Sequence, residues 1–186
     1  MLTLSILIVG IAGLGFYVIR IYNGLVRGRN NVKSAWSSID VQLKRRYDLI
    51  PNLVETVKGY AAHERQTLET VTQARQRALD FTGGLEERAK IEGLLAQSLR
   101  SLFALAEAYP DLKANQNFLA LQEQLAGTEN KIGFARQYYN DLARDYKNRV
   151  EVFPGNLVAD LFGFQAEPFF QVEGAEELSV PQVKMN

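Results

Sequence analysis

The side chains that most often carry chemistry are scarce in this chain. His63 is the only histidine, and there is no cysteine. The pair His63-Glu64 begins like a zinc-protease helix, but Thr67 stands where that motif needs its second histidine. One histidine also cannot supply both Glu-x-x-His pairs of a di-iron helical bundle. We therefore expect no catalytic residues, no metal site and no cofactor, and we keep an unrecognised hydrolase as a remote alternative.

Two further patterns could bind phosphate groups. Gly83-Gly84 lacks the Lys-Ser/Thr pair that follows a phosphate-binding loop. The basic trio Lys44-Arg45-Arg46 fits a phosphate or a lipid headgroup, although a solvated helix turn explains it equally well. The 21 Lys and Arg residues balance the 21 Asp and Glu residues, so nucleic-acid binding has no support.

The N-terminal segment from Met1 to Ile19 contains no charged side chain and stops at Arg20. A helix of this length spans roughly 28 Å, close to the ~30 Å hydrocarbon core of a bilayer. A cleaved signal peptide would have basic residues before the run and small residues after it, whereas this run ends in Phe16-Tyr17-Val18-Ile19. A buried core helix would show a polar face, which is missing here. We expect residues 1–20 to form a single-pass transmembrane anchor.

Basic residues follow this span at Arg20, Arg27 and Arg29. Positive charges next to a membrane helix favour the cytoplasmic side. We therefore expect the short N-terminus outside and the remaining chain in the cytoplasm. The same charges would attract anionic headgroups.

Apolar residues recur at spacings of three and four after the span, which indicates long amphipathic helices with coiled-coil-like packing. Pro51 predicts a helix break, with Asp48 capping the next helix. Gly83-Gly84 predicts a left-handed helix end, Pro110 closes a third helix, and Asp111 or Asn115 can cap a fourth. The predicted helices are 21–48, 49–81, 85–109 and 112–153. Short connections favour an all-α, antiparallel up-down bundle of about four helices that continues from the membrane helix, over the alternative of one extended rod.

The composition changes after Pro154-Gly155. Residues 154–172 are rich in Leu and Phe and predict an apolar C-terminal strap that fills a groove on the bundle, or an amphipathic segment that touches the bilayer. Residues 173–186 are acidic, lack aromatic residues and are predicted to be disordered.

Three segments resemble the LemA family: YNGLVRGRNNVKSAWSSIDVQLKRRYDLIPNLVETVKGYAAHE (22–64), AEAYPDLKANQNFLALQEQLAGTENKIGFARQYYND (106–141) and FPGNLVADLFGF (153–164). The resemblance covers nearly the whole chain. One departure is Tyr146-Lys147-Asn148, where family members often have Tyr-Asn. The resemblance implies a bacterial inner-membrane protein with a short external N-terminus and a helical bundle, and it carries over no catalytic residues. The motif residues have no assigned role: Trp36, Arg45, Arg46, Asp48, Pro51, His63, Glu64, Asn115, Glu129, Asn130, Arg136 and Asn140. Glu129, Asn130 and Arg136 fit a packing network better than a site.

The function that these features favour is a non-enzymatic, membrane-tethered scaffold or adaptor that binds an unknown protein partner. The alternative is a membrane-remodelling or lipid-organising protein that uses the basic turn and the aromatic C-terminal segment. Gly10 and Gly13 lie on one side of the anchor, and small residues there predict self-association into a homo-oligomer.

Overall fold

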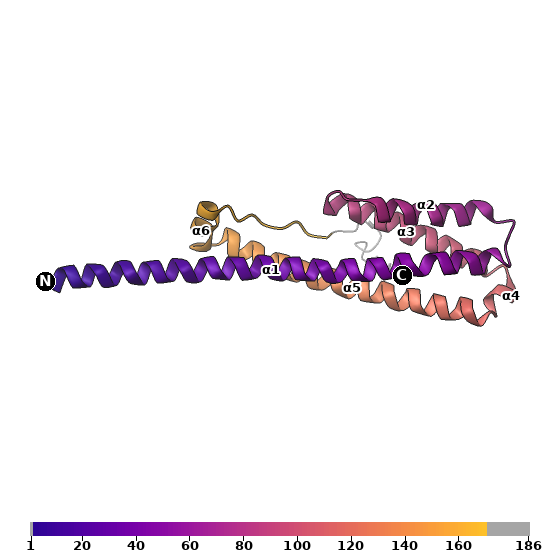
Figure 1. Cartoon of the computed structure of the whole chain (residues 1–186), viewed down its shortest axis with the longest axis horizontal. Coiled ribbons are helices and arrows are strands. Elements are labelled where there is room, and N and C mark those ends of the chain that lie inside the picture. Colours follow the sequence, from indigo (N-terminus) through magenta and orange to yellow (C-terminus); the bar gives the residue numbers. More distant parts are fainter. Residues whose placement is uncertain (1, 171–186) are drawn as a thin grey trace, which may run out of the picture. The chain divides into compact units, whose positions relative to one another are not determined.

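The computed structural model describes residues 2–170, and every regular element within that range is a helix (Figure 1). The helices are α1 (Leu2–Lys58), α2 (Arg65–Asp80), α3 (Leu85–Ala106), α4 (Pro110–Lys113), α5 (Gln116–Glu151) and α6 (Gly155–Phe162). The all-α class is confirmed, and the apolar span continues without interruption into the rest of α1. The tail predicted to be disordered and the last two residues of the predicted strap lie outside the described residues.

The described chain forms two compact units that both use α1 and α5. The first unit contains residues up to Lys44 together with Thr128–Phe169, and the second contains Arg45–Gly127 together with Phe170. We call them the hairpin unit and the bundle unit.

The bundle unit is a four-helix, up-down arrangement of the end of α1, α2, α3 and the start of α5. α2 and α3 are joined by residues 81–84 and lie side by side (Figure 1). Each helix buries one apolar stripe, as the sequence periodicity predicts. The buried core includes Ile50, Leu53, Leu68, Val71, Leu95, Leu102, Leu112 and Leu125.

The predicted helix break at Pro51 is wrong. α1 continues through Pro51 to Lys58, Asp48 is exposed within the helix, and the chain reverses at residues 59–64. Proline has no N–H, so the carbonyl of Tyr47 loses its usual donor four residues on. Arg75 on α2 replaces it, since its Nε–H donates to the Tyr47 carbonyl oxygen at 2.7 Å. The helix tolerates the proline because a neighbouring helix satisfies the carbonyl that it leaves open.

Other helix ends differ from the predictions in detail. α2 ends at Asp80 with an extended Phe81 (φ −76°, ψ 124°), and Gly84 is the extended N-cap of α3, so neither glycine forms a left-handed end. Among the described residues, positive φ occurs at Gly163, which closes α6 at φ 70°. The predicted fourth helix is split into α4 and α5. Asn115 caps the first turn of α5 as predicted, because its Oδ1 accepts a hydrogen bond from the Phe118 N–H at 3.0 Å.

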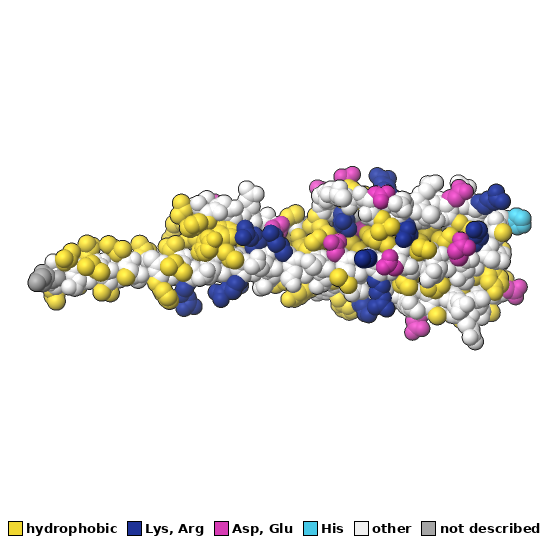
Figure 2. Space-filling view, viewed as in Figure 1, with side chains coloured by type: hydrophobic (Ala, Val, Ile, Leu, Met, Phe, Trp, Pro, Cys, Tyr) yellow, Lys and Arg dark blue, Asp and Glu magenta, His cyan; other side chains and the backbone are white. Residues whose placement is uncertain are grey.

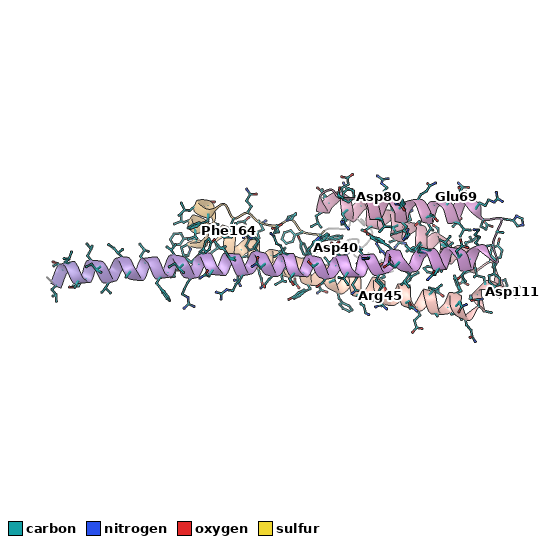
Figure 3. The ribbon with its side chains drawn as sticks, viewed as in Figure 1. Asp40, Arg45, Glu69, Asp80, Asp111 and Phe164 are labelled. Carbon is teal, nitrogen blue, oxygen red and sulfur yellow. The ribbon has the colours of Figure 1, made fainter. Side chains whose placement is uncertain are left out.

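The hairpin unit pairs the part of α1 that follows the apolar span with the second part of α5, and α6 with residues 163–169 packs beside them (Figure 1). Gly28 lies under the ring of Tyr146, where a Cβ would stand 2.8 Å from Cδ2. The hydroxyl of Tyr139 donates to the Pro168 carbonyl oxygen at 2.8 Å. Phe164 is buried and its ring contacts α1 at Tyr22 (Figure 3). Residues 163–169 therefore pack on the two helices.

The beginning of α1 is apolar and wholly unburied, and Figure 2 shows apolar side chains along the face in view. Within residues 2–170 it is the one helix long and apolar enough, by length and composition, to cross a membrane.

Candidate functional site

The bundle unit encloses a pair of opposite charges that α1 and α3 contribute. Arg46 and Glu92 are each 1% exposed, and Nη2 of Arg46 forms an ion pair with Oε2 of Glu92. The other carboxylate oxygen, Oε1, accepts a hydrogen bond from the hydroxyl of Tyr47. A charge in a core is tolerated when it is paired and hydrogen-bonded, which both oxygens of Glu92 are.

Tyr47 must stay protonated to keep its hydrogen bond to Glu92. Burial, the hydrogen bond to Glu92 and the charge of Glu92 together raise the pKa of Tyr47 well above its usual value. The hydroxyl therefore remains protonated near neutral pH and continues to donate to Glu92. With its carboxylate occupied on both oxygens and its members buried, the cluster is built to fix the register of α1 against α3.

Glu92 is the residue of this cluster that sequence reasoning missed. A signal for it exists, because the buried positions Glu92, Leu95, Leu99, Leu102 and Ala106 follow spacings of three and four along α3. Arg46 likewise falls between the buried Leu43 and Ile50 on α1. The idea of one exposed basic trio is wrong for Arg46, whereas Lys44 and Arg45 are exposed.

A second polar group joins the α1–α2 connection to the region around α4. The hydroxyl of Tyr109 donates to Oε1 of Glu64 at 3.1 Å, and Nδ2 of Asn115 donates to the hydroxyl of Tyr60 at 2.9 Å. The hydrogen bond to Glu64, more than burial, raises the pKa of Tyr109. Two motif residues, Glu64 and Asn115, thus hold loops together, while His63, which precedes Glu64, is exposed.

The remaining motif residues lie on α1 and α5. The ring of Trp36 meets Tyr139 edge-on at 5.8 Å within the hairpin unit. Glu129 and Asn130 are exposed on α5, and Arg136 and Asn140 are half-buried. Gly10 and Gly13 lie on the unburied apolar part of α1.

The bundle unit also contains cavities and exposed acidic side chains. A cavity of about 690 Å³ lies between the end of α1 and α2, with Val54, Lys58 and Leu68 among its lining residues. Glu69 and Asp80 on α2 and Asp111 on α4 are exposed (Figure 3). Nowhere in residues 2–170 do three or more His, Asp or Glu side chains come close enough to hold a metal ion.

The fold defines an α-helical bundle protein whose first helix starts as an unburied apolar span. The chain belongs to the LemA family, which it matches over residues 35–185. It is 28% identical to Protein LemA of Metamycoplasma hominis over 162 residues, which cover 85% of this chain and 72% of that protein. It is also 22% identical to Magnetosome protein MamQ 2 of Paramagnetospirillum magneticum, covering 86% of this chain and 68% of that protein. Magnetosome protein MamQ of Magnetospirillum gryphiswaldense is 22% identical as well, over 87% of this chain and 70% of that protein.

Proposed function

We propose that this chain is a membrane-anchored, non-enzymatic scaffold or adaptor. The observation that carries the proposal is the continuity of α1, which begins as an unburied apolar span and ends as a core helix of the bundle unit. A partner bound to the helices would therefore be tethered directly to the membrane. The relatives named as magnetosome proteins support an attachment of this kind, and the buried Arg46–Glu92 pair supports a structural use of the charged core.

The orientation belongs to the same proposal. Arg20, Arg27 and Arg29 follow the span, so the short N-terminus lies outside the bacterial inner membrane and the helical units lie in the cytoplasm. Because the chain has no cysteine, Ala62→Cys in the exposed α1–α2 connection gives a single reporter. A membrane-impermeant maleimide should label it after permeabilisation and leave it unlabelled in intact spheroplasts. Labelling in intact spheroplasts would reverse the orientation.

The feature of α5 that best fits a protein partner is an exposed aromatic pair. Phe134 is 73% exposed and Tyr138 is 59% exposed. Their spacing of four residues places the two rings next to each other on one helix face. Aromatic side chains supply much of the binding energy at protein interfaces. We infer that this pair is part of the surface that the partner contacts.

The test is purification of the full-length chain from native membranes after crosslinking, followed by mass spectrometry. The adaptor proposal expects a defined partner whose yield falls at least tenfold in Phe134→Ala with Tyr138→Ala. The matched control is Leu79→Ala with Leu94→Ala, which removes exposed apolar side chains from α2 and α3. An equal loss in the control, or a set of proteins indistinguishable from that of an unrelated membrane protein, would contradict the proposal.

A lipid-organising role is the second candidate. Two observations favour it: Lys44 and Arg45 are exposed, and α6 exposes Leu157, Leu161 and Phe162. Full-length protein reconstituted into anionic vesicles separates the two functions. Tubulation or clustering of vesicles by the protein alone would favour lipid organisation, whereas unchanged vesicles favour the adaptor.

A further inference from the structure

The position of α6 along α1 ties it to the end of the apolar span. The ring of Tyr22 on α1 meets Phe162 of α6 at 4.9 Å and Phe164 at 5.5 Å between ring centroids. Tyr22 is three residues beyond Ile19, the last residue of the span, which is roughly 4.5 Å along a helix axis. The headgroup layer on each side of the hydrocarbon core is about 5–7 Å thick. When the span crosses a bilayer, Tyr22 and the part of α6 that contacts it therefore lie at headgroup depth.

The surface that α6 presents at this depth is apolar. Val158 and Ala159 are buried against the hairpin unit, whereas the exposed side chains include Leu161 at 76% and Phe153 at 74%. The exposed apolar residues of the α5–α6 turn and α6 are Val152, Phe153, Leu157, Leu161 and Phe162. Figure 2 shows apolar side chains over α6 and along the neighbouring span of α1. A contiguous group of this kind marks a contact with protein or membrane.

The charged residues around this surface favour a membrane over a protein. Arg20, Arg27 and Arg149 are exposed, and the guanidinium of Arg29 lies 5.1 Å from the centroid of the Phe164 ring. Mixed aromatic and basic side chains are typical of the interface between hydrocarbon and headgroups. Asp160 is the acidic side chain of α6, and Glu151 pairs with Lys147 at 3.8 Å.

A cavity of about 440 Å³ opens beside the same surface, between α1 and α5 of the hairpin unit. Ile21, Leu25 and Val152 line it, and Arg149 closes one side with a hydrogen bond from Nη1 to the Gly24 carbonyl oxygen at 3.4 Å. Apolar walls hold ordered water poorly, because a water molecule needs polar partners. The cavity therefore suits segments of lipid chains at the edge of the hydrocarbon core.

We propose that α6 and the α5–α6 turn form a second membrane contact, in which Phe153, Leu157 and Leu161 enter the bilayer that the α1 span crosses. The contact surface is a bilayer containing anionic phospholipid, and the proposal rests on the membrane anchoring proposed above. In this arrangement α6 holds the hairpin unit against the membrane surface, and we call it the α6 membrane contact.

The test uses the full chain in vesicles of phosphatidylcholine and phosphatidylglycerol, with one spin label on an introduced cysteine. Leu161→Cys reports on α6, Leu7→Cys on the span, and Val41→Cys is the control. Val41 is also an exposed apolar residue (62%), but it lies 21 residues beyond Arg20, roughly 31 Å along α1. Collision with oxygen and with a water-soluble nickel reagent distinguishes lipid, water and protein surroundings.

The α6 membrane contact predicts high oxygen and low nickel accessibility at Leu161, as at Leu7, with high nickel accessibility at Val41. A label at Leu161 that is as accessible to nickel as the one at Val41 overturns the α6 membrane contact and leaves the proposed α1 anchor intact. Low accessibility to both reagents at Leu161 means protein contact, such as a second copy, and also overturns it. A water-accessible Leu7 would refute the anchor and, with it, the depth argument for α6.

Discussion

At the scale of residues, the ion pair of Arg46 and Glu92 decides how the bundle unit responds to mutation. Both charges have been removed from water, which costs several kcal/mol per ion before their attraction is counted. The hydrogen bond from Tyr47 lowers this cost by satisfying the second carboxylate oxygen. We therefore expect the pair to add specificity to the packing of α1 on α3 more than net stability.

Replacing one partner should expose that cost. Glu92→Leu leaves the Arg46 charge buried without its counter-ion, so we expect the free energy of unfolding to fall by about 3–5 kcal/mol. Arg46→Met combined with Glu92→Leu and Tyr47→Phe should restore most of it, since apolar residues of similar volume pack without charge and no hydroxyl is left without its acceptor. Chemical denaturation of the full chain in detergent, followed by helical circular dichroism, measures both values.

The exposed pair of Lys58 with Glu55, at 3.4 Å, is the control. Glu55→Ala should change the free energy of unfolding by about 1 kcal/mol or less, because water already solvates both charges. A triple variant at Arg46, Tyr47 and Glu92 that is as unstable as Glu92→Leu alone would show that the ion pair itself, and not an orphaned charge, stabilises the bundle unit.

The sequence pattern predicts that positions 46 and 92 are buried, but it does not predict that Arg46 and Glu92 pair with each other. Spacings of three and four place Arg46 and Glu92 on the same stripes as buried leucines and isoleucines, so their burial could have been predicted. Their charges instead favoured exposed positions, because lysine, arginine and glutamate are rarely buried. A single sequence gives no direct signal that two such exceptions face each other across 46 residues.

At the scale of elements, Pro51 shows why helix boundaries are harder to predict than helices. The all-α class, the apolar span and Asn115, one of the two caps considered for the last long helix, follow from local pattern alone and are confirmed. The break at Pro51 was predicted from a local rule that a distant residue overrides, since Arg75 supplies the donor missing from the helix. Which arginine of α2 does so depends on packing, which the sequence pattern does not show.

This explanation predicts an energetic coupling between the two residues. Arg75→Met should cost about 1–3 kcal/mol of unfolding free energy, because it leaves the buried Tyr47 carbonyl without a donor. In a Pro51→Ala background the N–H of residue 51 supplies that donor, so the same change should cost markedly less. A double-mutant cycle by chemical denaturation gives the coupling directly.

The control for this cycle is Arg77→Met, which removes an exposed arginine from the same helix. We expect it to be near neutral in both backgrounds. An equal cost for Arg75→Met with proline and with alanine at position 51 would show that Arg75 acts through its other contacts and not through the open carbonyl.

At the scale of the whole molecule, the sequence predicts the kind of protein better than its action. The span, its basic flank and the helical stripes are dictated by hydropathy and charge, and these local patterns are enough to indicate an anchored bundle. The surface that we propose for a partner, Phe134 and Tyr138, follows the same helical period as the core and is recognised only when exposure is known.

Self-association of the anchor is the prediction that concerns the intact protein in its membrane. Gly10 and Gly13 lie three residues apart on one side of α1, and a Cβ added at either position would meet no atom within 4 Å. Isoleucine at both positions is therefore compatible with the fold of one chain, and its effect would report on contacts between chains. Small residues allow membrane helices to approach closely, so Gly10→Ile with Gly13→Ile should weaken a homo-oligomer.

Crosslinking at native expression in native membranes should give a ladder of the single protein, and the double variant should reduce the dimer band by several-fold. Leu7→Ile with Leu14→Ile is the matched control, since it changes the shape of two exposed apolar residues of the span without filling a small-residue face. The control should keep the ladder. A ladder of equal strength in the glycine variant would move the association to other surfaces, and a monomer in the unaltered chain would remove any role of the two glycines in association.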